Sequence, residues 1–240
     1  MDREYSIGYH FEQVKYWYAF AEFRMRFKVT EASYQYTNNW FEAATKGFWD
    51  SIIPQINPTR ILEIGSYEGA SACYLIEALG QQKDIEIHCI DTWEADLENN
   101  ESGSAQSDMP AVEKRFNHNT QLAIGKVSGK VEFVKHKGFS DAILSKLLAS
   151  GKQSYFDFIY VDGSHQAPDV LCDALLSFRL LKTQGVIAFD DYLWQEQLSY
   201  GTDPVRCPKL AIDAFTNIYC RKLRIIPAPL YQLYIKKISD

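Results

Sequence analysis

The segment from Arg60 to Gly69 constrains the fold more than any other part of this sequence. It is a short apolar run that ends in Glu63-Ile-Gly65 and continues through a second glycine, Gly69, toward a helix. Glycine allows the chain to turn sharply, and the bare amides at a helix start can receive an anion. A strand, a glycine turn and a helix in this order indicate a nucleotide-type binding loop at a sheet edge.

Short apolar runs alternate with helical patterns through the rest of the chain. The runs predicted as strands are Arg60–Ile64, Glu86–Ile90, Val131–Val134, Phe156–Val161 and Val186–Phe189. The helices between them are predicted to start near Ala70, Pro110, Ser140 and Pro168. This alternation predicts an α/β fold whose mostly parallel sheet is covered by helices on both faces.

Aromatic residues at spacings near three and four predict two amphipathic helices before the first strand, at Phe11–Phe27 and Asn39–Ile52. We therefore predict an N-terminal helical extension or cap over residues 1–56, followed by one domain over residues 57–240. The aromatic side chains of the extension are expected to pack inside the protein or to form a contact in a homo-oligomer.

The C-terminal part contains a predicted helix around Lys209–Cys220 and two apolar runs, Arg224–Pro227 and Leu230–Lys236. These runs are close enough in sequence to form an antiparallel pair at the sheet edge. Two irregular segments, Ala95–Met109 and Tyr192–Pro208, are predicted as loops, and with the N-terminal helices they are expected to select the substrate.

The net charge of −6 and the scattered basic residues exclude an obvious surface for nucleic acid or an anionic membrane. A small neutral or cationic substrate suits this charge better. The cysteines lie far apart without a CxxC pair, so neither a disulfide framework nor a zinc site is indicated. No signal peptide or apolar run of about 20 residues is present, which makes the cytoplasm the expected location.

Tyr67 decides which nucleotide the loop is expected to hold. A dinucleotide loop has glycine at this middle position so that a pyrophosphate can approach the backbone, and a tyrosine side chain would obstruct that approach. S-adenosylmethionine carries no phosphate and needs an acidic partner for its ribose, which Asp91 can supply at the end of the next strand. The alternative is a structural turn next to a solvated aspartate.

These motifs resemble those of class I S-adenosylmethionine-dependent methyltransferases. The Arg60–Gly69 segment is similar to their first motif and Ile90-Asp91-Thr92-Trp93 to their second, while Gly138-Phe-Ser140-Asp141 resembles the turn that contacts adenine in catechol O-methyltransferase and its relatives. The resemblance implies a Rossmann-like, doubly wound, seven-stranded sheet with an antiparallel edge strand. The residues expected to bind the cofactor are Glu63, Gly65, Ser66, Tyr67, Gly69, Ser71, Asp91, Thr92, Trp93, Gly138, Phe139, Ser140, Asp162 and His165.

Three carboxylates are expected to converge at the carboxyl edge of the sheet: Asp162 after the fourth strand, and Asp190 with Asp191 after the fifth. Oxygen ligands of this kind suit Mg²⁺ or another divalent cation, which orients a hydroxyl and lowers its pKa. The alternative for Asp190 and Asp191 is a solvated strand end.

The resemblance to catechol and antibiotic sugar O-methyltransferases implies that Asp162, Asp190 and Asp191 hold the metal. An aspartate at position 191, where the catechol enzyme has asparagine, favours the sugar or natural-product branch. His165 stands where the catechol enzyme has its catalytic lysine, so Asp162 and His165 are the predicted catalytic residues. The alternative for His165 is a turn residue before the next helix.

The leading interpretation is therefore metal-assisted O-methyl transfer to a small hydroxylated molecule such as a sugar, polyol, phenol or natural product. A cephalosporin hydroxylase-like enzyme on the same fold is a second interpretation. A non-catalytic protein that binds S-adenosylmethionine is a third, and a dinucleotide oxidoreductase is disfavoured by Tyr67.

Overall fold

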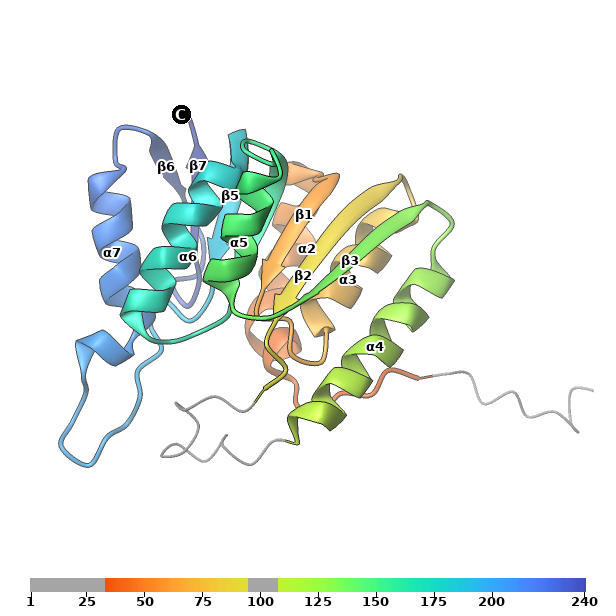
Figure 1. Cartoon of the computed structure of the whole chain (residues 1–240), viewed down its shortest axis with the longest axis horizontal. Helices are drawn as coiled ribbons and strands as arrows, with labels where there is room; N and C mark the ends of the chain where they lie inside the picture. Colours follow the sequence, from red (N-terminus) through yellow and green to blue (C-terminus); the bar gives the residue numbers. More distant parts are fainter. Residues whose placement is uncertain (1–32, 95–107) are drawn as a thin grey trace, which may run out of the picture. The chain divides into compact units, whose positions relative to one another are not determined.

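A seven-stranded sheet organises the part of the chain that the computed structural model describes, residues 33–94 and 108–240 (Figure 1). Gln35–Asp240 forms one compact unit. The strands are β1 (Arg60–Ile64), β2 (Ile85–Asp91), β3 (Val131–Lys137), β4 (Phe156–Val161), β5 (Leu181–Phe189), β6 (Leu223–Ile226) and β7 (Leu233–Lys237).

The strand order is β3-β2-β1-β4-β5-β7-β6. Strands β1 to β5 pair in parallel, whereas β7 runs antiparallel to both β5 and β6. The predicted doubly wound sheet and its antiparallel edge are therefore confirmed. The order reverses between β1 and β4, and open α/β sheets bind ligands beyond the carboxyl ends of the strands at such a reversal.

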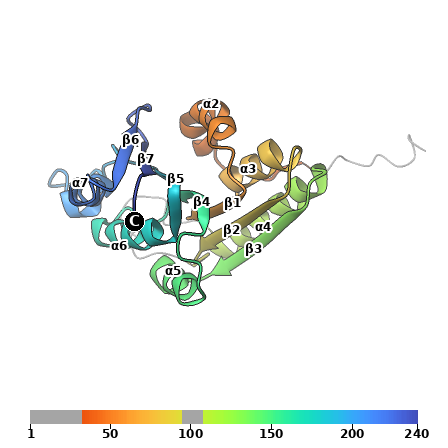
Figure 2. The same ribbon diagram turned by 90° about the horizontal axis from the view of Figure 1, so that it is seen from above.

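Helices cover both faces of the sheet (Figure 2). Helices α2 and α3 lie on one face, with α4 packed against α3, and α5, α6 and α7 lie on the other. Their bounds are α2 (Lys46–Ile56), α3 (Ala70–Gly80), α4 (Met109–Lys126), α5 (Ser140–Ala149), α6 (Ala167–Leu180) and α7 (Pro208–Ile218). Apolar side chains of β1, β4 and β5 pack against the helices into a common core.

Strand β5 is longer than the sequence pattern predicts. It begins at Leu181, which pairs with Phe156, and the register shifts before Phe158 pairs with Val186. Gln184 has a left-handed φ of 73° beside Gly185. The irregular residues therefore lie inside the strand, whereas the predicted strand began only at Val186.

The helix predicted at Asn39–Ile52 is present, although its first turn is a π-helix and its end lies four residues later than predicted. A single π-helical turn, η1 (Phe41–Thr45), leads into α2, which extends to Ile56 through Pro54. The helix predicted at Phe11–Phe27, with its proposed oligomer contact, and most of the predicted loop Ala95–Met109 lie outside the described residues. Among the described helices, none combines the length and apolar character that crossing a membrane requires.

Trp49 fixes α2 to the sheet. Its side chain is fully buried and its ring meets Phe158 and Tyr160 edge to face, at centroid distances of 5.6 and 4.8 Å. The indole Nε1 donates a 2.8 Å hydrogen bond to the Tyr234 hydroxyl on β7. One side chain therefore joins the segment before β1 to two strands, β4 and β7.

Replacing Trp49 with alanine is expected to lower the free energy of unfolding by about 3–5 kcal/mol, because it leaves a cavity and removes the hydrogen bond that the Tyr234 hydroxyl accepts. Urea unfolding followed by circular dichroism measures this change. The control is Gln55→Ala on the exposed side of α2, expected to change stability by less than about 0.5 kcal/mol. Equal effects of the two substitutions would contradict this role for Trp49.

Candidate active site

The glycine loop after β1 is held from below by Glu63. This carboxylate is fully buried and accepts hydrogen bonds from the hydroxyls of Ser66 and Ser71, both at 2.5 Å. Burial raises the pKa of Glu63, and the two serine hydroxyls act in the opposite direction. Glu63 therefore shapes the loop from inside the protein.

Gly65 is required by a close approach of two strand ends. Its φ is +84°, and a Cβ placed on it would lie 1.8 Å from the carbonyl oxygen of Asp162. The Asp162 amide donates to the Ile64 carbonyl at 2.8 Å, so the turns after β1 and β4 are in direct backbone contact. The glycine loop and the first predicted catalytic acid are consequently one structural unit.

Asp91 binds the glycine loop in this structure. Its Oδ2 accepts from the amides of Ser66 and Tyr67, at 3.0 and 2.8 Å, and its Oδ1 accepts from the Trp93 amide at 2.7 Å. Burial raises the pKa of Asp91, while these amide donors counteract that rise. Asp91 thus supports the loop, and its contact with a ribose stays a prediction.

Trp93 lies in the core. It is 1% exposed, and its indole Nε1 donates to the Tyr67 carbonyl at 2.9 Å. Its ring packs on Phe116 with a centroid distance of 4.7 Å. Neighbouring Thr92 accepts a hydrogen bond from the Glu94 amide at 3.3 Å. In this structure Trp93 supports the glycine loop from the core through its hydrogen bond to Tyr67.

The predicted adenine turn lies next to Asp91. The Gly138 amide donates to the Asp91 carbonyl at 2.9 Å, Phe139 is 68% exposed, and Ser140 begins α5.

Asp173 on α6 is a buried acid next to this turn. Burial raises the pKa of Asp173 to about 7, and a hydrogen bond from Ser140 opposes the rise. Asp173 is 1% exposed, and its Oδ1 has no hydrogen-bond partner among the residues that the structure describes.

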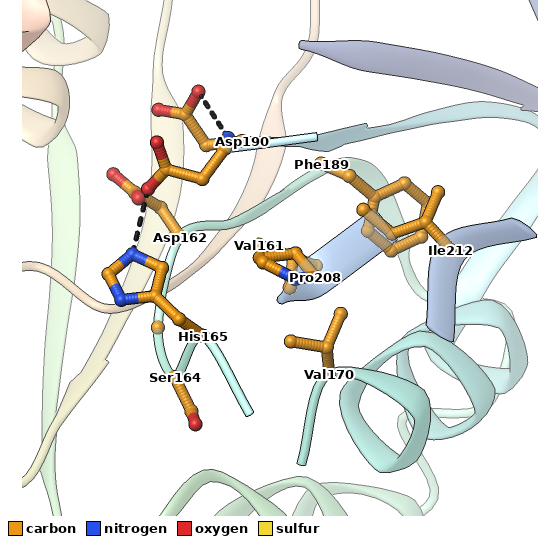
Figure 3. A pocket seen from close by; sticks show the side chains of 11 residues that line it. Val161, Asp162, Ser164, His165, Val170, Phe189, Asp190, Pro208 and Ile212 are labelled. Atoms are coloured by element: carbon orange, nitrogen blue, oxygen red, sulfur yellow. Dashed lines mark hydrogen bonds and ion pairs between the residues drawn. The ribbon is translucent and has the colours of Figure 1, made fainter. Parts of the chain in front are cut away.

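The three predicted metal ligands meet at the ends of β4 and β5 (Figure 3). Removal from water, followed by repulsion from Asp190 and Asp191, raises the pKa of Asp162 well above its usual value. Burial and the charge of Asp191 also raise the pKa of Asp190. Asp190 is held by the Tyr160 hydroxyl, by Gln232 Nε2 at 2.9 Å and by the Asp191 amide at 2.9 Å.

His165 faces this acidic group. Its Nε2 lies 2.9 Å from Asp191 Oδ2, the contact drawn in Figure 3. The imidazole also stacks on Trp194, with a centroid distance of 4.1 Å and an interplanar angle of 19°. The ring is therefore oriented by a carboxylate at its edge and by an indole on its face.

The donor chemistry of this group fits a divalent cation. Its oxygens belong to carboxylates of adjacent strand ends, and their mutual repulsion is the interaction that a cation would relieve. Over residues 33–94 and 108–240, however, no three histidine, cysteine or acidic side chains are already arranged as a metal site. Asp190 and Asp191 instead accept hydrogen bonds from protein groups.

A cavity of about 520 Å³ connects the glycine loop to the acidic group. The predicted site residues that line it are Gly65, Ser66, Tyr67, Ser71, Asp162, His165, Asp190 and Asp191. The predicted cofactor residues outside its lining are Glu63, Gly69, Asp91, Thr92, Trp93, Gly138, Phe139 and Ser140. The cavity therefore joins the start of the predicted cofactor site to the predicted catalytic residues.

Sequence reasoning missed several residues of this cavity. One wall comes from the segment before α2 and includes Trp40 and Phe41. Glu68, 2% exposed, holds that segment by accepting from the Thr37 amide at 2.7 Å and from the Thr37 hydroxyl at 2.8 Å. The sequence shows an acidic residue next to Gly69, but it does not show that this residue is buried or that its partner lies 31 residues away.

The comparisons with known proteins agree with this geometry. Residues 62–192 match the family described as Methyltransferase domain, and the chain belongs to this family. The interpretation as a class I S-adenosylmethionine-dependent methyltransferase is therefore confirmed.

Curated relatives include a caffeoyl-CoA O-methyltransferase of Populus kitakamiensis, 26% identical over 74% of this chain and 68% of the relative. The caffeoyl-CoA O-methyltransferase 1 of Eucalyptus globulus is 30% identical over 61% of this chain, which spans half of that relative's length. The O-methyltransferase TomG of Streptomyces achromogenes, solved with S-adenosylmethionine, shares the fold. Its TM-score is 0.53 and its identity is 18%, over 79% of this chain and 77% of TomG.

Gly65→Ala is expected to abolish soluble folded protein or to lower the unfolding free energy by more than about 3 kcal/mol, because the Cβ meets the Asp162 backbone. Thermal unfolding measures the change. Gly125→Ala in α4 is the matched control, since nothing lies within 4 Å of its Cβ, and it is expected to be neutral or slightly stabilising. Wild-type stability of Gly65→Ala would contradict the proposed backbone contact.

Asp173 is expected to make stability fall as pH rises from about 4 to about 7. Its pKa is raised from 3.8 to about 7 in the folded protein, so the folded state binds the proton more tightly than the unfolded state. The stabilisation that comes from protonated Asp173 is complete below about pH 4, and it is lost as the pH rises through about 7. Urea unfolding between pH 4 and 8 should show a weaker decline for Asp173→Asn than for Glu132→Gln, an exposed control on β3. Parallel pH profiles would refute the assignment.

Proposed function

We propose that this protein transfers the methyl group of S-adenosylmethionine to a hydroxyl oxygen of a small molecule. The observation that carries the proposal is the shared cavity, in which the glycine loop at Gly65–Tyr67 adjoins Asp162 and His165. The names of the curated relatives, which are O-methyltransferases, support oxygen as the acceptor atom.

In this reaction the methyl group leaves the sulfonium sulfur, which keeps the bonding electron pair as a thioether, and bonds to the acceptor oxygen. The hydroxyl proton must leave as the bond forms. His165 is the proposed proton acceptor. With Nε2 donating to Asp191, its Nδ1 would take the proton, and Asp191 would stabilise the resulting imidazolium.

Trp194 and Asp191 are proposed to hold the imidazole in this orientation, because one stacks on the ring and the other binds its edge. Asp162, Asp190 and Asp191 are the residues proposed to hold a divalent cation. Such an ion would lower the pKa of the acceptor hydroxyl and fix its direction. Binding of the ion requires ionised carboxylates and would lower the raised pKa values of Asp162 and Asp190.

Transfer of labelled methyl from S-adenosylmethionine to a panel of catechols, polyols and glycosides, with Mg²⁺ and with chelator, tests the proposal. Asp162→Asn is expected to lower kcat by more than about 100-fold and to change cofactor affinity less than about threefold. Asp91→Asn is the matched acid-to-amide variant, expected to weaken cofactor binding at least about tenfold because the loop loses its anchor.

Calorimetric titration with S-adenosylmethionine and initial-rate measurements separate the two effects. Full activity of Asp162→Asn in the presence of chelator would refute the metal-assisted mechanism. Cofactor binding without methyl transfer to any acceptor of the panel would refute the proposed activity.

A further inference from the structure

The ionisable side chains that line the cavity are all acidic except for His165 and the tyrosines. Neither lysine nor arginine occurs among the lining residues that the structure describes. The acidic lining residues are Glu68, Asp162, Asp190, Asp191 and Glu196. The electrostatic potential inside the cavity is therefore expected to be negative.

Two of these acids, Glu68 and Glu196, form ion pairs with arginine side chains. Arg115 Nε lies 2.5 Å from Glu68 Oε1, and Arg206 binds both oxygens of Glu196, at 2.6 and 3.0 Å. Glu196 is 5% exposed, so this pair is largely removed from water. Moving Arg206 to a bound anion would leave the Glu196 charge buried without a partner, which is strongly unfavourable.

The described cavity walls are rich in aromatic surface. Trp40 is 61% exposed and its ring lies 5.5 Å from that of Tyr67. Across the cavity lining are Trp194, stacked on His165, and Tyr231, which is 42% exposed. Indole and phenol faces attract flat rings and positively charged groups, and they offer nothing to a phosphate.

We propose that the acceptor is a hydroxylated ring compound without phosphate or carboxylate groups, either neutral or bearing an ammonium group. This inference rests on the proposed function and concerns the same cavity. A phosphate near Asp190 or Asp191 would meet like charge, and no lysine or arginine lies among the described residues that line the cavity. A divalent ion and the cofactor's sulfonium together would carry as much positive charge as ionised Asp162, Asp190 and Asp191 carry negative charge. No net positive charge would then remain to attract a phosphate. The preferred acceptor thus differs from the CoA thioester named for the curated relatives.

Methyl caffeate and caffeoyl-CoA test this proposal. They present the same dihydroxyphenyl ring, but only caffeoyl-CoA carries phosphates. We expect kcat/KM for the methyl ester to exceed that for the CoA thioester by at least about tenfold, which corresponds to about 1.4 kcal/mol. Equal use of the two, or preference for the thioester, overturns the inference and leaves the proposed methyl transfer intact.

A positive charge introduced into the cavity wall provides a second test of the proposal. Asn39→Lys places a cation in the lining and is expected to reduce the preference for methyl caffeate at least about fivefold. Ser145→Lys adds the same charge at an exposed position of α5 outside the lining and is expected to leave the preference within about twofold. An equal shift in both variants would attribute the preference to net charge and overturn the proposal.

Equilibrium binding distinguishes failure of this inference from failure of the proposed function. If neither compound is methylated although S-adenosylmethionine binds, the proposed function fails for these acceptors. Calorimetry on the cofactor-saturated protein then compares methyl caffeate with caffeoyl-CoA directly. Tighter binding of the methyl ester supports the inference, and tighter binding of the thioester refutes it.

Discussion

The backbone contact between the ends of β1 and β4 is the constraint on which the site depends. At Gly65 the chain passes so close to the Asp162 carbonyl that no side chain fits between them. Neighbouring parallel strands already run side by side, and this contact continues their pairing into the loops through the Asp162 amide and the Ile64 carbonyl. The loop proposed to bind the cofactor and the acid proposed to act on the acceptor are thereby held at a fixed separation, without any flexible side chain between them.

The same arrangement places like charges together at a cost in stability. Asp162 and Asp190 have raised pKa values because burial and neighbouring carboxylates disfavour their ionised forms. Tyr160 and Gln232 offset part of this cost by donating to Asp190, and the backbone amide of Asp191 adds a third donor. Groups whose ionisation is disfavoured in the folded protein gain most from a cationic ligand. The strand ends are therefore electrostatically prepared for positive charge.

The fold and the convergence of the acids could be predicted from the sequence because both follow from local patterns. Alternating apolar runs set the parallel strands, and residues that follow such strands must meet at one edge of the sheet. Asp162 and Asp190 are examples: each directly follows its strand, and both line the cavity.

The partners of several residues could not be read from the same patterns. The contact of Asp91 with a ribose stays a prediction, but the sequence did not indicate that its carboxylate accepts hydrogen bonds from amides of the glycine loop 24 and 25 residues earlier. The role of Trp93 at the cofactor likewise stays a prediction, but the sequence did not indicate that its ring packs on Phe116, in a helix from another part of the chain. Side-chain direction at a strand end depends on such distant contacts, which sequence spacing does not encode.

The segment before α2 shows how distant contacts join a wall of the cavity to the glycine loop. Glu68 belongs to the glycine loop and holds Thr37, while Asn119 of α4 binds Gln35 through both its Oδ1 and its Nδ2 and also donates to the Glu68 carbonyl. The wall carrying Trp40 is therefore anchored to the loop expected to hold the cofactor. Because these anchors are buried or half-buried hydrogen bonds, changes in the loop should be transmitted to this wall. The cavity can thus present its aromatic wall in one position relative to Gly65 and Asp162, which is the condition for aligning an acceptor oxygen with a methyl donor.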